Sequence, residues 1–169
     1  MSEGVADELL AGNERFASDF AAAGLEAAPA LGVAIVACMD ARLDVAAALG
    51  LEPGAAHVIR NAGGVVSDDV VRSLAISQRK LGTTEIVLVH HTRCGMATIT
   101  DEEFSAELEA DAGVAPPFPI EAFDDVDGSV RESIVRLRNS PFIPRRDRIR
   151  GFVYDVDTGL LREVDPGPA

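Results

Sequence analysis

The chain has 169 residues, 47% of them hydrophobic and 5% aromatic, and its formal net charge is −13 at pH 7. This length suffices for a buried core without disulfide bonds, and the low aromatic content indicates a core of Val, Ile, Leu and Ala, which favours helices packed on a sheet. The charge and a sequence pI near 4.5 argue against nucleic acid and anionic membranes as partners, since both would repel the chain.

The N-terminal segment, residues 1–30, is acidic and amphipathic. Apolar residues such as Leu9 and Phe16 recur at helical spacing over 5–23, which predicts one or two helices before the first strand. The segment has neither the basic nor the apolar region of a signal peptide, and no run in the chain is long enough to span a bilayer. We therefore expect a cytoplasmic protein whose two cysteines stay reduced and are metal ligands, catalytic groups or core residues.

The next part of the chain alternates strands and helices. A nearly continuous apolar run, residues 31–38, predicts a strand buried on both faces of a parallel sheet. After a short helix, a second strand is expected over 55–60. A helix then begins after the capping residue Ser67 and ends at Gly82, and residues 83–91 form the third strand. This βαβαβ order implies a parallel sheet.

The remaining third of the chain has a weaker pattern. It predicts a capped helix over 100–113, a Pro- and Asp-rich solvated loop over 114–128 and a helix over 129–139. Residues 150–164 alternate around an Asp-Thr-Gly turn and predict a late strand with a short hairpin. No repeat or interdomain linker is evident. We expect residues 1–169 to form one α/β domain, with a mainly parallel central β-sheet flanked by helices and an N-terminal helical arm.

Three metal-binding side chains follow the ends of predicted strands. Cys38 ends the first strand, while His91 ends the third and Cys94 follows in the next turn. Neighbouring parallel strands open a crevice at their carboxyl ends, where sites usually lie. Two thiolates and an imidazole suit Zn²⁺, and the spacing His-x-x-Cys lets both side chains reach one ion. Because a structural zinc site normally has four protein ligands, a count of three indicates a catalytic site with a position for water.

Asp40 and Arg42 directly follow the first of these residues. The Asp40 carboxylate can take the fourth metal position or pair with the Arg42 guanidinium. A carboxylate held by arginine stays ionised and accepts a hydrogen bond from a metal-bound hydroxide. This arrangement would make a nucleophile from water near neutral pH.

The motifs Cys-x-Asp-x-Arg and His-x-x-Cys, in this order, resemble the β-class carbonic anhydrases. The stretches CMDARLD, HVIRNAGG and RSLAISQRKLGTTEIVLVHHTRCGM are similar to its compact prokaryotic members, densely from Val33 to Met96 and more loosely to GFVYDVDTG near the end. The paired motifs are highly specific, whereas either one alone is a weak signal.

The resemblance implies a function and a site. Cys38, His91 and Cys94 match the ligands of one Zn²⁺ per chain, and Asp40 and Arg42 match the catalytic dyad, with Asp40 as a fourth ligand in a closed state. The implied reaction is reversible hydration of carbon dioxide to bicarbonate and a proton through a zinc-bound hydroxide. The implied assembly is a homodimer or higher homo-oligomer in which residues 1–30 pack on a partner subunit. The chain has no Trp, so the inhibitory bicarbonate pocket that some relatives build around a tryptophan is not expected.

Other functions stay open at this point. The same zinc site could serve hydrolysis of carbon disulfide or carbonyl sulfide, linear molecules that mimic carbon dioxide. The two cysteines could instead form a redox pair, or bind zinc in a non-catalytic regulatory protein. Against these, the chain has no Cys-x-x-Cys, and a regulatory site needs neither Asp40 nor Arg42. A phosphatase-like cysteine is excluded, because Asp44 stands where its loop needs arginine.

The histidines and two arginines have separate expected roles. His91 has the spacing to Cys94, so His90, on the opposite face of the strand, is expected in the core or pocket wall, and His57 is expected to be structural. The proton released in hydration could leave through His57, His90 or buffer. Arg60 and the loop after it could line the site, and Arg93 either faces solvent or binds an anion.

Overall fold

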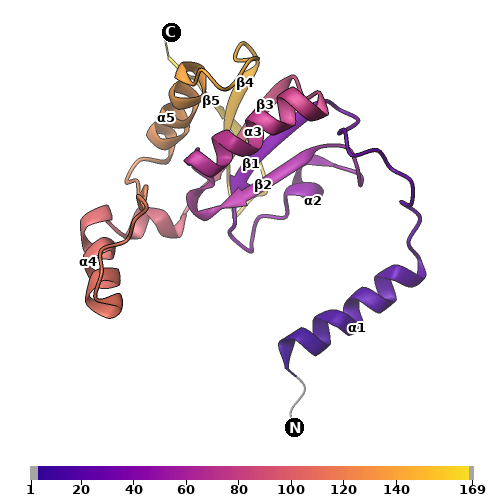
Figure 1. Cartoon of the computed structure of the whole chain (residues 1–169), viewed down its shortest axis with the longest axis horizontal. Coiled ribbons are helices and arrows are strands. Elements are labelled where there is room, and N and C mark those ends of the chain that lie inside the picture. Colours follow the sequence, from indigo (N-terminus) through magenta and orange to yellow (C-terminus); the bar gives the residue numbers. More distant parts are fainter. Residues whose placement is uncertain (1–3, 168–169) are drawn as a thin grey trace.

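The computed structural model describes residues 4–167 and confirms the predicted α/β class (Figure 1). The strands are β1 (Val33–Cys38), β2 (His57–Asn61), β3 (Glu85–His91), β4 (Ile149–Tyr154) and β5 (Leu161–Val164). The helices are α1 (Val5–Ser18), α2 (Val45–Leu49), α3 (Asp68–Leu81), α4 (Asp101–Ala112) and α5 (Val126–Asn139), with two short 3-10 helices, η1 (Ala62–Gly64) and η2 (Gly95–Thr98).

The five strands form one sheet in the order β2-β1-β3-β4-β5. The pairs β1–β2, β1–β3 and β3–β4 are parallel, and β5 runs antiparallel to β4. From β1 the chain continues to β2 on one side and later to β3 on the other. The strand order therefore reverses between β1 and β3, and in open α/β sheets a crevice for ligands lies at the carboxyl ends of such strands.

The two faces of the sheet have different covers. Helices α3 and α5 pack on one face over a core of aliphatic side chains that includes Val36, Leu74, Leu88 and Ile134. A Cβ atom at Gly151 in β4 would lie 2.2 Å from Val130 Cγ1, so glycine is needed where α5 crosses this strand. The other face carries a smaller cluster of Ile35, Ala37, Leu43, Val45 and Val89 beside α2.

The helix ends follow the capping signals in the sequence. Ser67 accepts a hydrogen bond from the backbone N–H of Val70 at the start of α3, and Gly82 ends this helix with a φ of 75°. Thr100 caps α4 in the same way. Helix α5 begins earlier than the sequence pattern predicts, because the Asp125 carboxylate accepts a hydrogen bond from Asp127 N–H and caps it there.

The predicted hairpin near the end of the chain is confirmed as β4 and β5. Its turn, residues 155–160, is closed by a hydrogen bond from Asp155 N–H to the Leu160 carbonyl, 2.8 Å. The Asp155 carboxylate accepts hydrogen bonds from the N–H groups of Asp157 and Thr158. These bonds fix the turn beside the end of β3, because β4 pairs with β3 through His91 and Tyr154.

Two helices extend from this sheet domain (Figure 1). Neither α1 nor α4, both within the described residues, contains a buried residue. In α1 the apolar side chains are at the surface, with Leu9 69% and Phe16 63% exposed. Within residues 4–167, no helix is both long and apolar enough to cross a membrane.

Candidate metal centre

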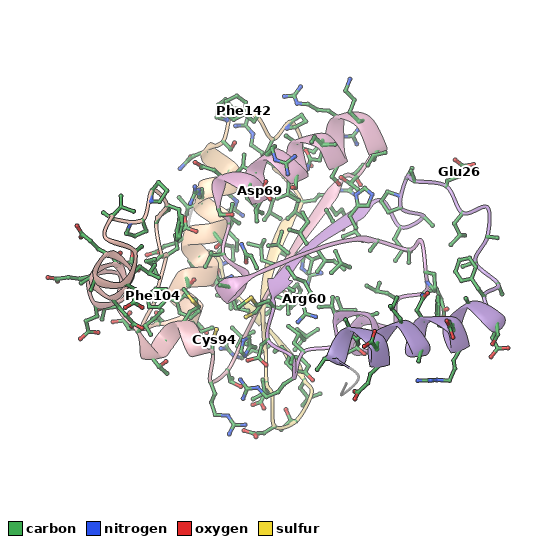
Figure 2. The ribbon with its side chains drawn as sticks, turned by 60° about the horizontal axis from the view of Figure 1, so that its bottom comes forward. Glu26, Arg60, Asp69, Cys94, Phe104 and Phe142 are labelled. Atoms are coloured by element: carbon green, nitrogen blue, oxygen red, sulfur yellow. The ribbon has the colours of Figure 1, made fainter. Side chains whose placement is uncertain are left out.

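The structure brings Cys38, His91 and Cys94 together at the carboxyl ends of β1 and β3. One potential ligand atom from each residue lies within 4.8 Å of the other two. All three side chains are buried, with exposed fractions of 4% or less. Cys94 and the guanidinium of Arg60 both lie at this end of the central strands (Figure 2). The register of the sheet explains the convergence, since β1 and β3 are parallel neighbours in which Ala37 pairs with Val89, so Cys38 and His91 end up at the same edge.

The His91 ring has the tautomer that a metal ligand needs. Its Nδ1 lies 2.9 Å from the Thr92 carbonyl oxygen, which only a ring N–H can approach as a hydrogen-bond partner. The proton on Nδ1 leaves a lone pair on Nε2. Among the described residues this buried Nε2 has no hydrogen-bond partner. A buried nitrogen without a partner beside two thiols is costly in itself and fits a bound metal ion.

The two thiols influence each other. Cys38 Sγ and Cys94 Sγ are 3.9 Å apart, in hydrogen-bond contact. The hydrogen bond from Cys94 lowers the pKa of Cys38, and contact with His91 lowers it further. The same hydrogen bond and burial raise the pKa of Cys94. One thiolate is thus favoured here before any metal binds, and thiolates are the form that ligates Zn²⁺.

Asp40 and Arg42 form a bidentate ion pair beside these ligands. Arg42 Nε donates to Asp40 Oδ1 over 2.9 Å, and Nη2 donates to Oδ2 over 2.7 Å. The Arg42 backbone N–H also donates to Oδ1. These bonds hold the pKa of Asp40 well below its usual range. Of the two positions expected for the carboxylate, the structure shows the one paired with arginine, with Oδ2 3.6 Å from His91 Nε2.

Arg60 fixes the backbone between the first ligand and the carboxylate. Its Nε donates to the Cys38 carbonyl over 3.0 Å, and Nη2 donates to the Asp40 carbonyl over 2.7 Å. The sequence predicts that Arg60 could line the site but indicates no particular role for it. A guanidinium that binds two backbone carbonyls leaves no signature in residue spacing, so this contact could be found only in the structure.

The loop after β2 approaches the site closely through Gly64. With a φ of 72°, Gly64 lies so near the end of β1 that a Cβ atom would be 2.8 Å from Cys38 N. Its carbonyl oxygen is 3.0 Å from His90 Nε2. His90 is fully buried, and burial lowers its pKa to about 4. The expected core position of His90 is confirmed, and His90 holds this loop against the sheet.

His57 and Phe123 complete the surroundings. His57 Nδ1 contacts Ser77 Oγ over 2.8 Å and Nε2 contacts the Ala27 carbonyl over 3.2 Å, as a structural histidine would. Phe123 stacks on the His90 ring with the centroids 5.8 Å apart. It comes from the Pro- and Asp-rich segment that was expected to be solvated throughout, so this expectation is wrong at Phe123. The segment also contains Phe118, which is 57% exposed, so the presence of an aromatic residue alone did not single out Phe123.

A cavity of about 230 Å³ opens on the ligand cluster. Its lining includes two thiols and one carboxylate, and the remaining lining residues have small or apolar side chains. The lining residues are Cys38, Met39, Asp40, Ala62, Gly63, Cys94, Gly95, Met96 and Ile99. Such a cavity suits a small uncharged molecule, because most of its wall offers no charge or hydrogen bond.

Comparison with known proteins identifies the family to which the chain belongs. The sequence model of the carbonic anhydrase family matches residues 33–161, so the chain belongs to the carbonic anhydrase family. It is 52% identical over 162 residues to Beta-carbonic anhydrase 1 of Mycobacterium tuberculosis, covering 96% of this chain and 99% of the relative. This relative places the chain in the β class.

Solved structures and more distant relatives agree with this placement. The crystal structure of carbonic anhydrase from Streptococcus mutans superposes with a TM-score of 0.91 at 48% identity, covering 98% of this chain and 100% of that one. Carbon disulfide hydrolase of an Acidianus species is 35% identical, covering 76% of this chain and 75% of the relative. Proteins named for carbonic anhydrase and for carbon disulfide hydrolase are thus both similar in sequence to this chain.

Proposed function

We propose that this protein catalyses the reversible hydration of carbon dioxide to bicarbonate and a proton, with one Zn²⁺ held by Cys38, His91 and Cys94. The observation that carries the proposal is the buried, unpartnered Nε2 of His91, which faces two thiols at the switch point of the sheet. Membership of the carbonic anhydrase family supports the reaction. A zinc ion bound here would act as a Lewis acid and lower the pKa of a water molecule toward about 7.

Asp40 has the position and charge to orient the attacking water. Arg42 keeps its carboxylate ionised, and its pKa lies far below neutral pH. The carboxylate can therefore accept a hydrogen bond from that water while Arg42 prevents it from turning toward the metal. Arg60 fixes the backbone on both sides of Met39, so Cys38 and Asp40 keep a constant separation.

The cavity beside the ligands supports a linear, uncharged substrate. Met39, Met96 and Ile99 give it apolar walls, and Asp40 lines it together with Cys38. The negative Asp40 carboxylate favours loss of the bicarbonate anion formed from carbon dioxide. Carbon disulfide is the alternative substrate, because named hydrolases of that molecule are among the relatives. The 52% identity to a β-carbonic anhydrase favours carbon dioxide.

The structure argues against His57 and His90 as acceptors of the released proton. His90 is fully buried with its pKa lowered to about 4, and His57 is bound to Ser77 and Ala27. We infer that buffer accepts the proton. Raising the buffer concentration should then increase the maximal rate, whereas His57→Ala should leave it unchanged.

We also propose that α1, within the N-terminal arm 1–30, packs on a partner subunit of a cytoplasmic homodimer or larger homo-oligomer. Its apolar side chains, including Leu9, Leu10 and Phe16, are more than half exposed in the single chain, and covering them would remove apolar surface from water. Leu9→Ser with Phe16→Ser should shift the mass measured by light scattering toward the monomer. Glu14→Ser, on the same helix, is the control, and an unchanged mass in the double variant would contradict the proposal.

The deciding experiment measures metal content and stopped-flow hydration of carbon dioxide on the same purified sample across pH. About one zinc per chain, with a rate that rises with pH, is the expected result. The same sample is then assayed with carbon disulfide. Stoichiometric zinc with turnover of carbon disulfide alone would transfer the proposal to that hydrolysis, and zinc with neither activity would indicate a regulatory protein.

A further inference from the structure

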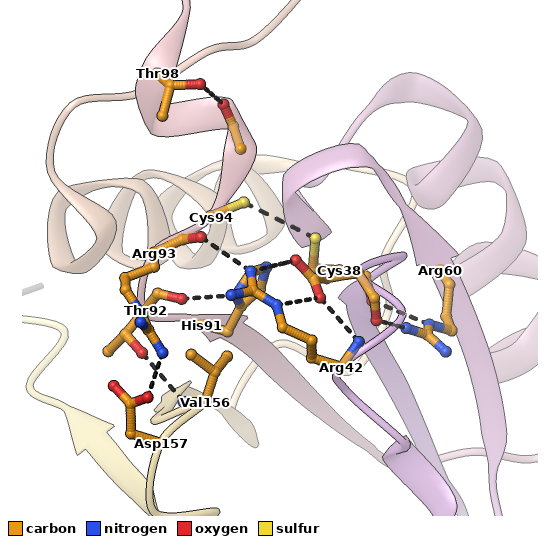
Figure 3. A network of polar contacts seen from close by, with 12 residues as sticks. Cys38, Arg42, Arg60, His91, Thr92, Arg93, Cys94, Thr98, Val156 and Asp157 are labelled. Atoms are coloured by element: carbon orange, nitrogen blue, oxygen red, sulfur yellow. Dashed lines mark hydrogen bonds and ion pairs between the residues drawn. The ribbon is translucent and has the colours of Figure 1, made fainter.

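The turn between His91 and Cys94 contains an unusual backbone conformation. Arg93 has a φ of 53°, in the left-handed region that side chains other than glycine, asparagine and aspartate seldom adopt. In this conformation its carbonyl oxygen accepts a hydrogen bond from Arg42 Nη2 over 3.0 Å. Figure 3 shows the Arg93 carbonyl directed at the Arg42 guanidinium, next to the two cysteines.

The side chain of Arg93 points the other way, toward the β4–β5 turn. It forms an ion pair with Asp157 in that turn. Thr92 adds two hydrogen bonds to the same hairpin, from its N–H to the Tyr154 carbonyl over 2.9 Å and from Val156 N–H to its Oγ1 over 3.1 Å. Two consecutive residues between His91 and Cys94, Thr92 and Arg93, thus contact the 155–160 turn.

The Arg93 carbonyl matters because Arg42 has few other contacts. Half of the Arg42 side chain is exposed, and its other recorded hydrogen bonds all go to Asp40. Because Arg42 is proposed to orient Asp40, the orientation of the Arg42 guanidinium must be set by a group other than Asp40. Among the described residues, the Arg93 carbonyl is the acceptor outside the pair that fixes the guanidinium.

We propose that Arg93 and Asp157 are positioning residues for the Asp40–Arg42 pair. The ion pair stabilises the left-handed conformation of Arg93, this conformation presents the carbonyl to Arg42, and Arg42 keeps Asp40 directed away from the metal. The proposal rests on the proposed function, since it assigns a catalytic purpose to the pair. Asp157 lies on the last hairpin, far in sequence from the motifs, whereas Arg93 lies between His91 and Cys94.

The expected effect is modest and depends on salt. Both side chains of the Arg93–Asp157 pair are more than half exposed, and exposed ion pairs contribute little and are screened by salt. We expect Asp157→Asn to lower kcat about two- to fivefold with KM unchanged, a range that one such pair can support. In molar salt the difference from the wild type should shrink.

The test combines kinetics with a direct view of Arg42. Each variant is measured for kcat and KM, zinc content, thermal unfolding and the ¹⁵N NMR signal of the Arg42 Nε–H group, assigned by its loss in Arg42→Lys. The matched control is Glu163→Gln, which removes a bidentate ion pair with Arg150, with side chains 47% and 61% exposed, from the same hairpin. Asp157→Asn should shift or broaden the Arg42 signal, and Glu163→Gln should leave it unchanged.

Charge reversal separates positioning from general stability. Arg93→Asp alone places two carboxylates opposite each other and should lower kcat further than Asp157→Asn. Adding Asp157→Arg restores an ion pair of opposite sense and should recover both kcat and the Arg42 signal. If the hairpin contributes only stability, kcat measured well below the melting temperature should be the same in all these variants, and only the melting temperature should change.

Two results would overturn the proposal. One is an Asp157→Asn protein that matches Glu163→Gln in kcat and in the Arg42 signal. The other is a fall in kcat with an unchanged Arg42 signal, since the effect would then bypass Arg42. If the wild type hydrates no carbon dioxide, the proposed function fails, but the Arg42 signal still reports whether Asp157 positions the guanidinium.

Discussion

The candidate site has two halves that are built in opposite ways. The Cys38, His91 and Cys94 side chains are at most 4% exposed and lie at strand ends fixed by the register of the sheet. The side chain of Arg42 is half exposed and that of Asp40 is 17% exposed, and outside the pair Arg42 donates a hydrogen bond to the backbone carbonyl of Arg93. The buried half is determined by the core, whereas the exposed half can respond to small changes at the surface.

This difference indicates how each half should fail. Loss of a buried ligand leaves the other two with an incomplete site, so the effect is nearly all-or-none. Loss of an exposed hydrogen bond changes the population of orientations, so the effect is graded. Substitutions of the buried ligands should therefore reduce activity most, and substitutions further out toward the surface should reduce it less.

The largest effect is expected for the ligands. Cys38→Ala, His91→Ala and Cys94→Ala should each lose zinc and hydration activity together, because two ligands bind the ion far more weakly than three. Metal analysis after gel filtration, paired with stopped-flow assays, checks this. Thr98→Ala, which removes a hydroxyl that donates to the Gly95 carbonyl, is the control. A fully active, zinc-loaded Cys38→Ala protein would remove Cys38 from the site.

Asp40→Ala should separate binding from turnover. The carboxylate does not ligate in the paired state, so zinc content should stay near one per chain. The rate should fall about a hundredfold, the lower end of what a positioned proton acceptor contributes. Steady-state kinetics and metal content on one sample check both parts, and a proportional loss of zinc would show that Asp40 is a ligand instead.

Arg42→Ala should displace the pH dependence of the rate. Arg42 lowers the pKa of Asp40, and without it the carboxylate is free to compete with water for the metal. Water competes better as it loses its proton, so activity should be low at neutral pH and recover at alkaline pH. A pH–rate curve that coincides with the wild type would contradict the role of the pair.

The smallest effect is expected for an ion pair outside the site. Arg162 contacts both carboxylate oxygens of Asp127, over 2.7 and 3.0 Å, and lowers its pKa. Asp127→Asn should lower the free energy of unfolding by roughly 0.5–1 kcal/mol at pH 7. Because the folded pKa is depressed, this stabilisation is present above the ordinary Asp value of 3.8 and is lost as the pH falls through the lowered value. Denaturant unfolding of the wild type and of Asp127→Asn, at pH 7 and again near the lowered pKa, measures this difference in free energy.

The buried half could be predicted from the sequence because the metal-binding residue types stand at, or just after, the ends of the apolar runs that predict the strands. Apolar runs located β1 and β3, and the residues at their ends were the chain's two cysteines and a histidine with the right spacing. The parallel arrangement of these strands followed from the βαβαβ pattern. A misplacement of either strand by one residue would have directed its ligand away, so the agreement tests the register as well.

The exposed half was predicted only in part. Asp40 and Arg42 were found by their motif, but the groups that position them act through backbone carbonyls or come from distant segments. Arg60 binds the Cys38 and Asp40 carbonyls, and Asp157 lies on the last hairpin. Residue identity does not show where a carbonyl points, and hydrophobic periodicity says nothing about which surface turn lies beside which.

The strand order also has a consequence for synthesis of the chain. Strands β2, β1 and β3 are contiguous in the sequence as well as in the sheet, and every proposed ligand lies between residues 38 and 94. Strands β4 and β5 are added at the outer edge and leave the ribosome last. The groups that would capture the metal are thus translated before the hairpin that contacts Arg93, and a nascent chain carries them together with Arg42 and Arg93 before Asp157, the partner of Arg93, has been added.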